Sequence, residues 1–180
     1  TLQNCEIAEY KGLSEVEKSD YSDENYKIIQ DVFLADINKL FVIRKPTAKT
    51  FDDVKKLVNK KINWIAFAKA EKEQQKQLAE SIVCKLEKAE ADDIHIINFG
   101  NTSVKKIDGT TLESHKYLGR LLGILTGCRM DQSITFKILD DLESVEEIGD
   151  TEEINAAINN GKLCLINDDE GVRIARGINS

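Results

Sequence analysis

The sequence lacks the features that mark several common classes of protein. No apolar run approaches the roughly 20 residues that a membrane-spanning helix needs, so we expect no membrane partner. Basic residues are in the minority, with 25 lysines and arginines against 32 acidic residues. The formal net charge of −7 argues against nucleic acid as a partner, because nucleic acid is itself negative.

Disulfide and zinc-binding patterns are absent as well. The cysteines form no C-x-x-C pair, and we interpret them as buried free thiols; they are Cys5, Cys84, Cys128 and Cys164. The first residues lack the basic-then-apolar pattern of a signal peptide, so we expect synthesis in a reducing cytoplasm. Because the chain begins with Thr1 rather than methionine, we expect it to be a piece of a longer protein.

Nucleotide-binding and catalytic motifs are also missing. The first predicted strand is followed by RKPTAKT, which has no glycine-rich turn to bring backbone amides onto a phosphate, and we expect no cofactor. His95 falls in a strand predicted to be buried and is interpreted as a core histidine. His115 lies on a predicted helix without the partners of a catalytic triad. The sequence therefore predicts a protein that is not an enzyme.

Carboxylates gather at two predicted turns. One holds Asp140 and Asp141, and the other holds Asp168, Asp169 and Glu170. A calcium loop would alternate its acids and close with a distant glutamate, and neither turn does so. We interpret these residues as solvated turn residues and expect no metal site.

Apolar residues recur at helical spacing in five segments. Ser22 is a candidate cap for the first, and Thr50 with Asp53 resembles a capping box for the second. Thr110 and Asp150, each followed three residues later by a glutamate, are candidate caps for the last two. The predicted helices cover residues 22–38, 50–58, 70–89, 110–127 and 150–161.

Short β-branched and aromatic runs between these helices predict strands at residues 39–44, 63–68, 93–99, 103–107, 133–139, 162–167 and 172–178. The turn letters DDEG join the last two into a hairpin. This alternation predicts an α/β fold: a mainly parallel or mixed sheet with helices on both faces and a C-terminal antiparallel hairpin. We expect residues 1–21 to be an entry segment and residues 22–180 to form a single domain, with an acidic surface connection at 140–150.

Three glycines lie four residues apart in the fourth predicted helix, at Gly119, Gly123 and Gly127. This spacing occurs in membrane helix dimers, but Arg120 and a polar first turn argue against lipid. Close packing of a soluble helix on the sheet is the better interpretation.

Four segments, in order, resemble the contractile tail sheath family of phages, phage-like elements and R-type bacteriocins. They read INWIAFA (62–68), ADDIHIINFGN (91–101), YLGRLLGILTGCRMDQSITFKIL (117–139) and AAINNGKLCLINDDEGVRIARGINS (156–180). The last is the most specific, because it resembles the family's short helix, glycine, strand, polar turn and strand ending in R-G-[IV]-N-[ST]. The resemblance runs from about Lys39 to Ser180.

The resemblance implies a structural subunit of a sheath. Such a subunit polymerises around an inner tube and contracts by rigid-body rearrangement, which drives the tube through a target cell envelope. The implied partners are identical subunits in helically stacked hexameric rings, the inner tail tube protein and the baseplate. The longer protein is expected to be made in the cytoplasm of a bacterial host and assembled into a virion tail or a released bacteriocin particle.

The resemblance also implies an N-terminal arm and a C-terminal domain that this chain lacks. We therefore expect the 180-residue chain alone to be monomeric. A final strand is expected to continue into the missing domain through Arg176, Gly177, Ile178, Asn179 and Ser180.

Contacts that are exchanged during contraction favour charged, wet surfaces over large apolar ones. Charge density alone suggests two such surfaces, and an ordinary solvated surface is the alternative interpretation of each. The candidate contact residues are Glu71, Lys72, Glu73, Lys76 and Glu80 on a predicted helix, and Asp140, Asp141, Glu143, Glu146 and Glu147 in the acidic connection.

Two other functions stay open at this point. A small α/β enzyme or ligand-binding domain would have its site at the carboxyl ends of the strands, near Ala68, Phe99 or Asn167, and filled strand ends would argue against it. An adaptor or baseplate component with sheath-like architecture is the other.

Overall fold

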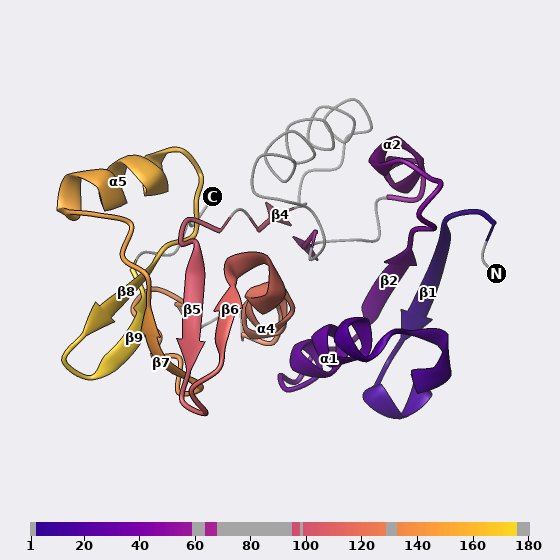
Figure 1. Cartoon of the computed structure of the whole chain (residues 1–180), viewed down its shortest axis with the longest axis horizontal. Coiled ribbons are helices and arrows are strands. Elements are labelled where there is room, and N and C mark those ends of the chain that lie inside the picture. The colour runs from indigo at the N-terminus through magenta and orange to yellow at the C-terminus, as the bar shows by residue number, and fades with distance from the viewer. Residues whose placement is uncertain (1–2, 59–63, 68–94, 98, 129–132, 176–180) are drawn as a thin grey trace.

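The computed structural model describes residues 3–58, 64–67, 95–97, 99–128 and 133–175, and these form two lobes (Figure 1). The amino-terminal lobe contains β1 (Glu6–Tyr10), α1 (Asp23–Val32), β2 (Leu40–Arg44) and α2 (Phe51–Lys55). The carboxy-terminal lobe contains β5 (Ser103–Lys106), β6 (Thr111–Glu113), α4 (Ser114–Thr126), β7 (Leu142–Val145), α5 (Thr151–Asn159), β8 (Leu165–Asp168) and β9 (Gly171–Ile174). Between the lobes, β3 (Trp64–Ile65) and β4 (His95–Ile96) form a short parallel pair.

The amino-terminal lobe has a small core of its own. Strands β1 and β2 pair antiparallel, with Tyr10 opposite Leu40, and α1 packs across them. The buried core side chains are Tyr10, Val16, Ile29, Val32 and Leu40. Residues 1–21, expected as an entry segment, thus contribute a strand and core side chains to this lobe.

Helix α1 begins where the sequence predicts and ends earlier. The Ser22 hydroxyl accepts a hydrogen bond from the Asn25 N–H at 3.3 Å, which confirms the cap. The helix ends at Val32 rather than near Asn38. The chain turns there so that Leu40 can enter β2 and the core, and this tertiary requirement overrides the helical pattern.

The capping box of α2 is also confirmed. The Asp53 carboxylate accepts hydrogen bonds from the Thr50 N–H at 3.2 Å and from Lys56 Nζ at 2.8 Å. The bond from Lys56, followed by that from Thr50, lowers the pKa of Asp53 to about 2.

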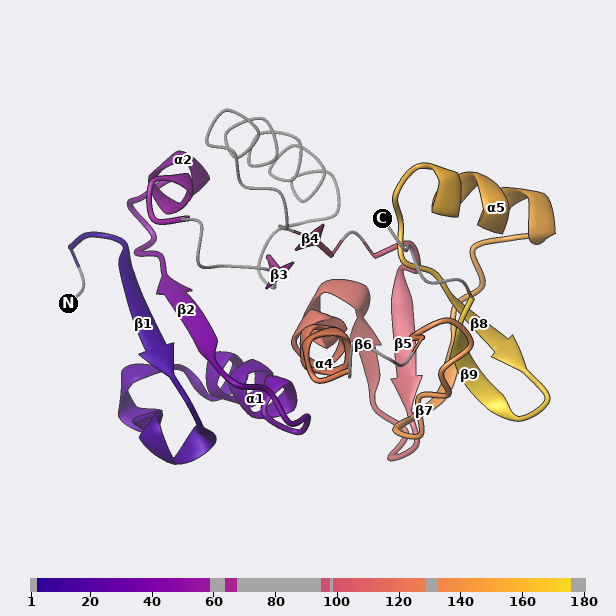
Figure 2. The ribbon, with the colours of Figure 1, turned by 180° about the vertical axis from the view of Figure 1, so that it is seen from behind.

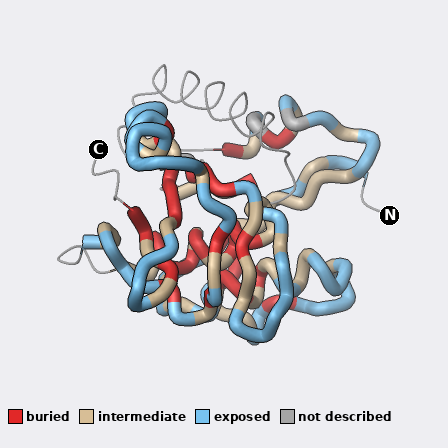
Figure 3. The backbone as a smooth tube through the Cα atoms, turned by 60° about the vertical axis from the view of Figure 1, so that its left-hand side comes forward, coloured by how far each residue is buried: buried red, intermediate tan, exposed pale blue. Residues whose placement is uncertain are grey.

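The carboxy-terminal lobe is built on a three-stranded antiparallel sheet in the order β6-β5-β7 and on the β8–β9 hairpin. Helix α4 lies against these strands and shares one buried core with them. Figure 3 shows that the buried residues gather in the interior of the chain. The core includes Ile97, Phe99, Val104, Tyr117, Leu118, Leu121, Leu142, Val145, Leu165, Val172 and Ile174. In the described part of the chain the ladders are antiparallel except that of β3 with β4, so the mixed arrangement is the one observed.

The closing hairpin is confirmed and is covered on both faces. Leu165 and Ile174 pack into the core beneath α4. Their neighbours Cys164 and Ala175 point the other way and pack with Ala157 of α5. Helices thus cover both faces of these strands, in agreement with the predicted α/β class.

Helix α5 follows its local signals closely. The Asp150 carboxylate accepts from the N–H groups of Glu152 and Glu153 at 2.9 and 3.0 Å, and the Glu153 carboxylate accepts from the Asp150 N–H at 3.2 Å. Just past its end, Gly161 has a positive φ of 74°, which glycine adopts without a steric penalty. Both predicted ends of this helix are confirmed.

Three predictions between residues 110 and 150 are wrong. Residues 111–113 form β6 rather than a first helical turn, because the turn Asp108-Gly109 folds them back onto β5. Residues 133–139 form no regular strand and follow the edge of β9 through single bonds, such as Phe136 N–H to the Ile174 carbonyl at 2.8 Å. The acidic connection contains β7, whose Leu142 and Val145 are buried.

The three spaced glycines bring α4 against α1 rather than against the sheet, and Figures 1 and 2 show these helices side by side between the lobes. A Cβ atom added at Gly119 would lie 2.7 Å from the Ile28 carbonyl oxygen, and one at Gly123 would lie 2.4 Å from that of Val32. Just past the ends of both helices, a Cβ atom added at Gly127 would lie 3.0 Å from the Ala35 Cβ. We call this contact of Gly119, Gly123 and Gly127 with α1 and the turn after it the glycine seam.

Replacing the α5 cap tests the assignment of this helix. Asp150→Ala removes the acceptor for two N–H groups and is expected to lower the free energy of unfolding by about 1 kcal/mol, measured by urea denaturation. The control Asn155→Ala, at an exposed position inside the same helix, is expected to be neutral or slightly stabilising. Equal losses in both variants would contradict the capping role.

Candidate functional site

The structure describes one of the two charged surfaces proposed from the sequence. Glu71, Lys72, Glu73, Lys76 and Glu80 lie outside the described residues, as do Arg176, Gly177, Ile178, Asn179 and Ser180. The acidic residues from Asp140 to Glu147 lie on and around β7, and all of them except Asp141 are exposed. The candidate contact surface within the described residues therefore lies at β7 and the segments beside it.

Several of these carboxylates already have partners inside the lobe. Glu143 binds Lys105 Nζ at 2.8 Å across the β5–β7 ladder. Glu146 accepts hydrogen bonds from the hydroxyls of Thr102 and Ser103 at 2.5 and 3.0 Å, and these bonds lower its pKa below the usual range. Glu147 has no hydrogen bond or ion pair to any residue that the structure describes.

Asp141 belongs to a half-buried pair at the base of α4. Its carboxylate accepts from the Tyr117 hydroxyl at 2.8 Å and lies 3.8 Å from Arg120 Nε. Tyr117 is only 1% exposed. Burial, followed by the nearby Asp141 charge, raises the pKa of Tyr117 far above the ordinary tyrosine value. This pair holds α4 on the end of β7.

Asn101, which the sequence did not single out, joins strands that form no ladder with each other. It is 1% exposed, and its side-chain amide donates to the carbonyls of Glu146 and Leu165, both at 2.9 Å. Its side-chain oxygen accepts from the Leu165 N–H at 2.8 Å. A buried amide that uses its groups in this way satisfies backbone atoms that would otherwise be unpaired.

Asn167 makes a similar link between β8 and β7. Its side chain accepts from the Val145 N–H and donates to the Val145 carbonyl, both at 2.9 Å. Asn101 was missed because an isolated asparagine near a turn carries little signal in one sequence, and Asn167 was named only as a strand end near a possible ligand site. The motif letters FGN and LIND place them at strand ends, which is the only hint.

Of the strand ends considered for a ligand site, the one at Phe99 is filled and the one at Asn167 is exposed. Phe99 is 2% exposed and packs in the core, and the side chain of Asn167 is committed to Val145. Ala68 lies outside the described residues. His115 Nδ1 is 3.3 Å from the Glu113 carboxylate at the first turn of α4.

The described residues contain neither a cluster of metal-ligating side chains nor a membrane-spanning helix. No group of three or more histidine, cysteine, aspartate or glutamate side chains there could hold a metal ion. No described helix is long and apolar enough to cross a bilayer.

At the hairpin turn Asp168 binds Arg173 Nε at 2.7 Å, and Glu170 binds the same guanidinium. These two carboxylates are thus ion-paired turn residues.

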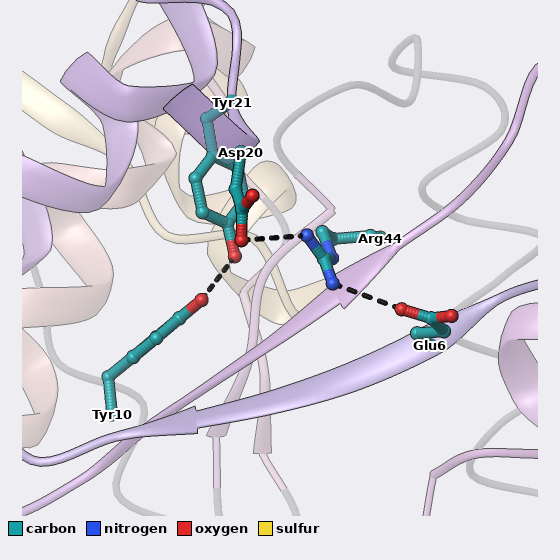
Figure 4. A network of polar contacts seen from close by, with 5 residues as sticks. All are labelled: Glu6, Tyr10, Asp20, Tyr21 and Arg44. Atoms are coloured by element: carbon teal, nitrogen blue, oxygen red, sulfur yellow. Dashed lines mark hydrogen bonds and ion pairs between the residues drawn. The ribbon is translucent and has the colours of Figure 1, made fainter. Parts of the chain in front are cut away.

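A second polar network lies in the amino-terminal lobe (Figure 4). Arg44 of β2 binds Glu6 of β1 at 3.0 Å and Asp20 at 3.3 Å, and its guanidinium lies 5.8 Å from the Tyr21 ring centre. The Tyr21 hydroxyl is 2.8 Å from that of Tyr10. Burial and this hydrogen bond raise the pKa of Tyr21. The network ties the turns before α1 to both strands.

Asn101 provides a direct test of these links. Asn101→Ala leaves one N–H and two carbonyl groups without their partner, and we expect a loss of about 2 to 4 kcal/mol in the free energy of unfolding. The control Asn159→Ala, at the exposed end of α5, is expected to stay within about 0.5 kcal/mol of the parent. A neutral Asn101→Ala variant, measured in urea, would refute the structural role.

Alkaline unfolding should depend on Tyr117. Because its pKa is raised in the folded state, the folded state favours the protonated form; its contribution to stability is complete below about pH 10 and is lost as the pH rises further. We expect Tyr117→Phe to flatten the decline of unfolding free energy above pH 10, measured by urea denaturation at several pH values. A slope equal to that of the parent would contradict this assignment.

Comparison with known proteins agrees with the sequence resemblance. A family model described as phage tail sheath protein central domain matches residues 12–180. A tail sheath protein of Clostridium phage phiCD119 is 33% identical over 119 residues, which cover 66% of this chain and 31% of that protein.

Two solved structures have the same fold. The sheath tail protein of Desulfitobacterium hafniense aligns with a TM-score of 0.56 and 17% identity, over 76% of this chain and 40% of that one. The sheath tail protein Lin1278 of Listeria innocua gives 0.56 and 20%, over 77% and 36%. This chain spans between about a third and two fifths of the length of these relatives.

Proposed function

This chain belongs to the phage tail sheath family, whose central domain it matches, and we propose that within its longer protein it acts by stacking against identical copies around an inner tube. In this proposal the longer protein, made in a bacterial host, also contacts the tube and the baseplate. The sheath contracts as its subunits pass between two packings, driven by interface free energy rather than by hydrolysis.

The observation that best supports a structural role is how the polar groups of the carboxy-terminal lobe are used. Asn101 and Asn167 bind backbone atoms, and Asp141, Glu143 and Glu146 bind side chains of the same lobe. An active site needs polar groups that converge on a ligand. Here the described groups converge on other parts of the fold, which favours a building block over an enzyme or a ligand-binding domain.

Imaging the longer protein tests the proposal. We expect it to form tubes of regular diameter in negative-stain electron microscopy, and the 180-residue chain alone to sediment as a monomer of about 20.3 kDa. A longer protein that stays dispersed under conditions in which it is folded would overturn the proposal.

The acidic surface near β7 is a proposed subunit contact, and Glu147 is the best residue with which to test it. Glu147→Lys reverses an exposed charge without removing a described internal contact, whereas reversal of Glu143 or Glu146 also breaks bonds to Lys105 or Thr102. We expect fewer or shorter tubes from the Glu147→Lys form of the longer protein, because a contact loses charge complementarity.

The matched control is Glu17→Lys, an exposed glutamate in the amino-terminal lobe that has no described side-chain partner. It should assemble like the parent protein. Normal tubes from both variants would remove the β7 surface from the contact proposal and leave sheath membership intact.

A further inference from the structure

The two lobes meet mainly through one contact. Among the described elements, α1 against α4 is the extensive contact between the amino-terminal and carboxy-terminal lobes, and both ribbon views show it (Figures 1 and 2). Each lobe otherwise packs around its own buried cluster. The half-buried Leu122 contacts both clusters at the point where they meet.

The closeness of this contact depends on glycine. At Gly123 an added Cβ would lie 2.4 Å from the Val32 carbonyl oxygen and 3.1 Å from its carbon, which are backbone atoms of a helix and cannot move separately. At Gly119 the nearest atoms are the Ile28 carbonyl oxygen at 2.7 Å and a methyl group of the same residue at 2.8 Å. A side chain at either position would push α1 away from α4.

The ion pair that spans the seam is weak. Lys116 and Glu24 approach to 3.9 Å, but both side chains are about half exposed, so solvent and salt screen the pair. The glycines supply backbone contact and no side chain to interlock. At Gly119, Gly123 and Gly127 the seam contributes no side chain to either core, and regions with few buried apolar side-chain contacts open first.

We propose that the glycine seam is a latch between two separately packed lobes. When it is closed, the lobes move as one rigid body; when it opens, each lobe keeps its fold, and this opening precedes unfolding of either core. The latch itself does not depend on the proposed sheath function, but its use does: a subunit that exchanges one packing for another needs the seam shut to carry force from lobe to lobe.

A graded set of glycine replacements in the 180-residue chain tests the latch. Small-angle X-ray scattering should give the parent a radius of gyration near the roughly 16 Å expected of a compact chain of this length. We expect a clear increase for Gly123→Ala and a smaller one for Gly119→Ala, where part of the clash is with a movable side chain.

Gly12→Ala is the control, because an added Cβ there has only Ser14 Oγ at 3.8 Å and the backbone is extended. It should scatter like the parent. Hydrogen exchange supplies the second readout, since the amides of Leu165 and Ile174 lie in the hairpin and belong to the carboxy-terminal core rather than to the seam. They should keep parental protection in all three variants.

Two results would overturn the latch. Unchanged scattering from a folded Gly123→Ala variant would mean that the seam does not set the distance between the lobes. Loss of hairpin protection in both Gly119→Ala and Gly123→Ala would mean that the lobes unfold together. Neither result bears on the proposed sheath function, which fails only if the unmodified longer protein does not form tubes.

Discussion

Buried backbone groups have to find hydrogen-bond partners, and this requirement shapes the carboxy-terminal lobe. Its strands form several short ladders in place of one continuous sheet, so some strand edges meet without pairing. The side-chain amides of Asn101 and Asn167 bridge two of these gaps by binding the backbone on the far side. Each side-chain amide replaces hydrogen bonds that a strand ladder would otherwise make. The two amides are therefore not available to bind a ligand.

The same pattern governs the charged residues. A dense acidic run suggested a loose, solvated surface, but the run surrounds strand β7. Asp141 is tied to α4, Glu143 to β5, and Glu146 to the hydroxyls of Thr102 and Ser103. Fewer carboxylates at this surface are therefore available for contacts with other molecules than the sequence suggests. Glu147 is the clearest example of one that is available. Contact surfaces of this lobe have to be sought residue by residue, because charge density overstates them.

Features with a local cause could be predicted from the sequence. Ser22, Asp150 and Gly161 mark helix ends through bonds or backbone angles that span only a few residues. The turn Asp108-Gly109 is an equally local hairpin signal, but the residues directly after it were predicted as the start of a helix. The end of α1 at Val32, the membership of β7 in a sheet and the links made by Asn101 depend on contacts between distant segments, which one sequence does not reveal. The spaced glycines indicated close helix packing correctly, while their partner, α1, could be identified only in three dimensions.

Both faces of the β8–β9 hairpin are packed against buried clusters. Leu165 and Cys164 point into different cores, so a shift by a single position would carry a leucine into the small space beside α5 and a thiol into the large core. Sequence change in this hairpin is therefore limited to substitutions that keep the length of its strands. Insertions and deletions should be tolerated only at its exposed tip, around Asp169, which makes the tip the natural place to graft a label or a new peptide.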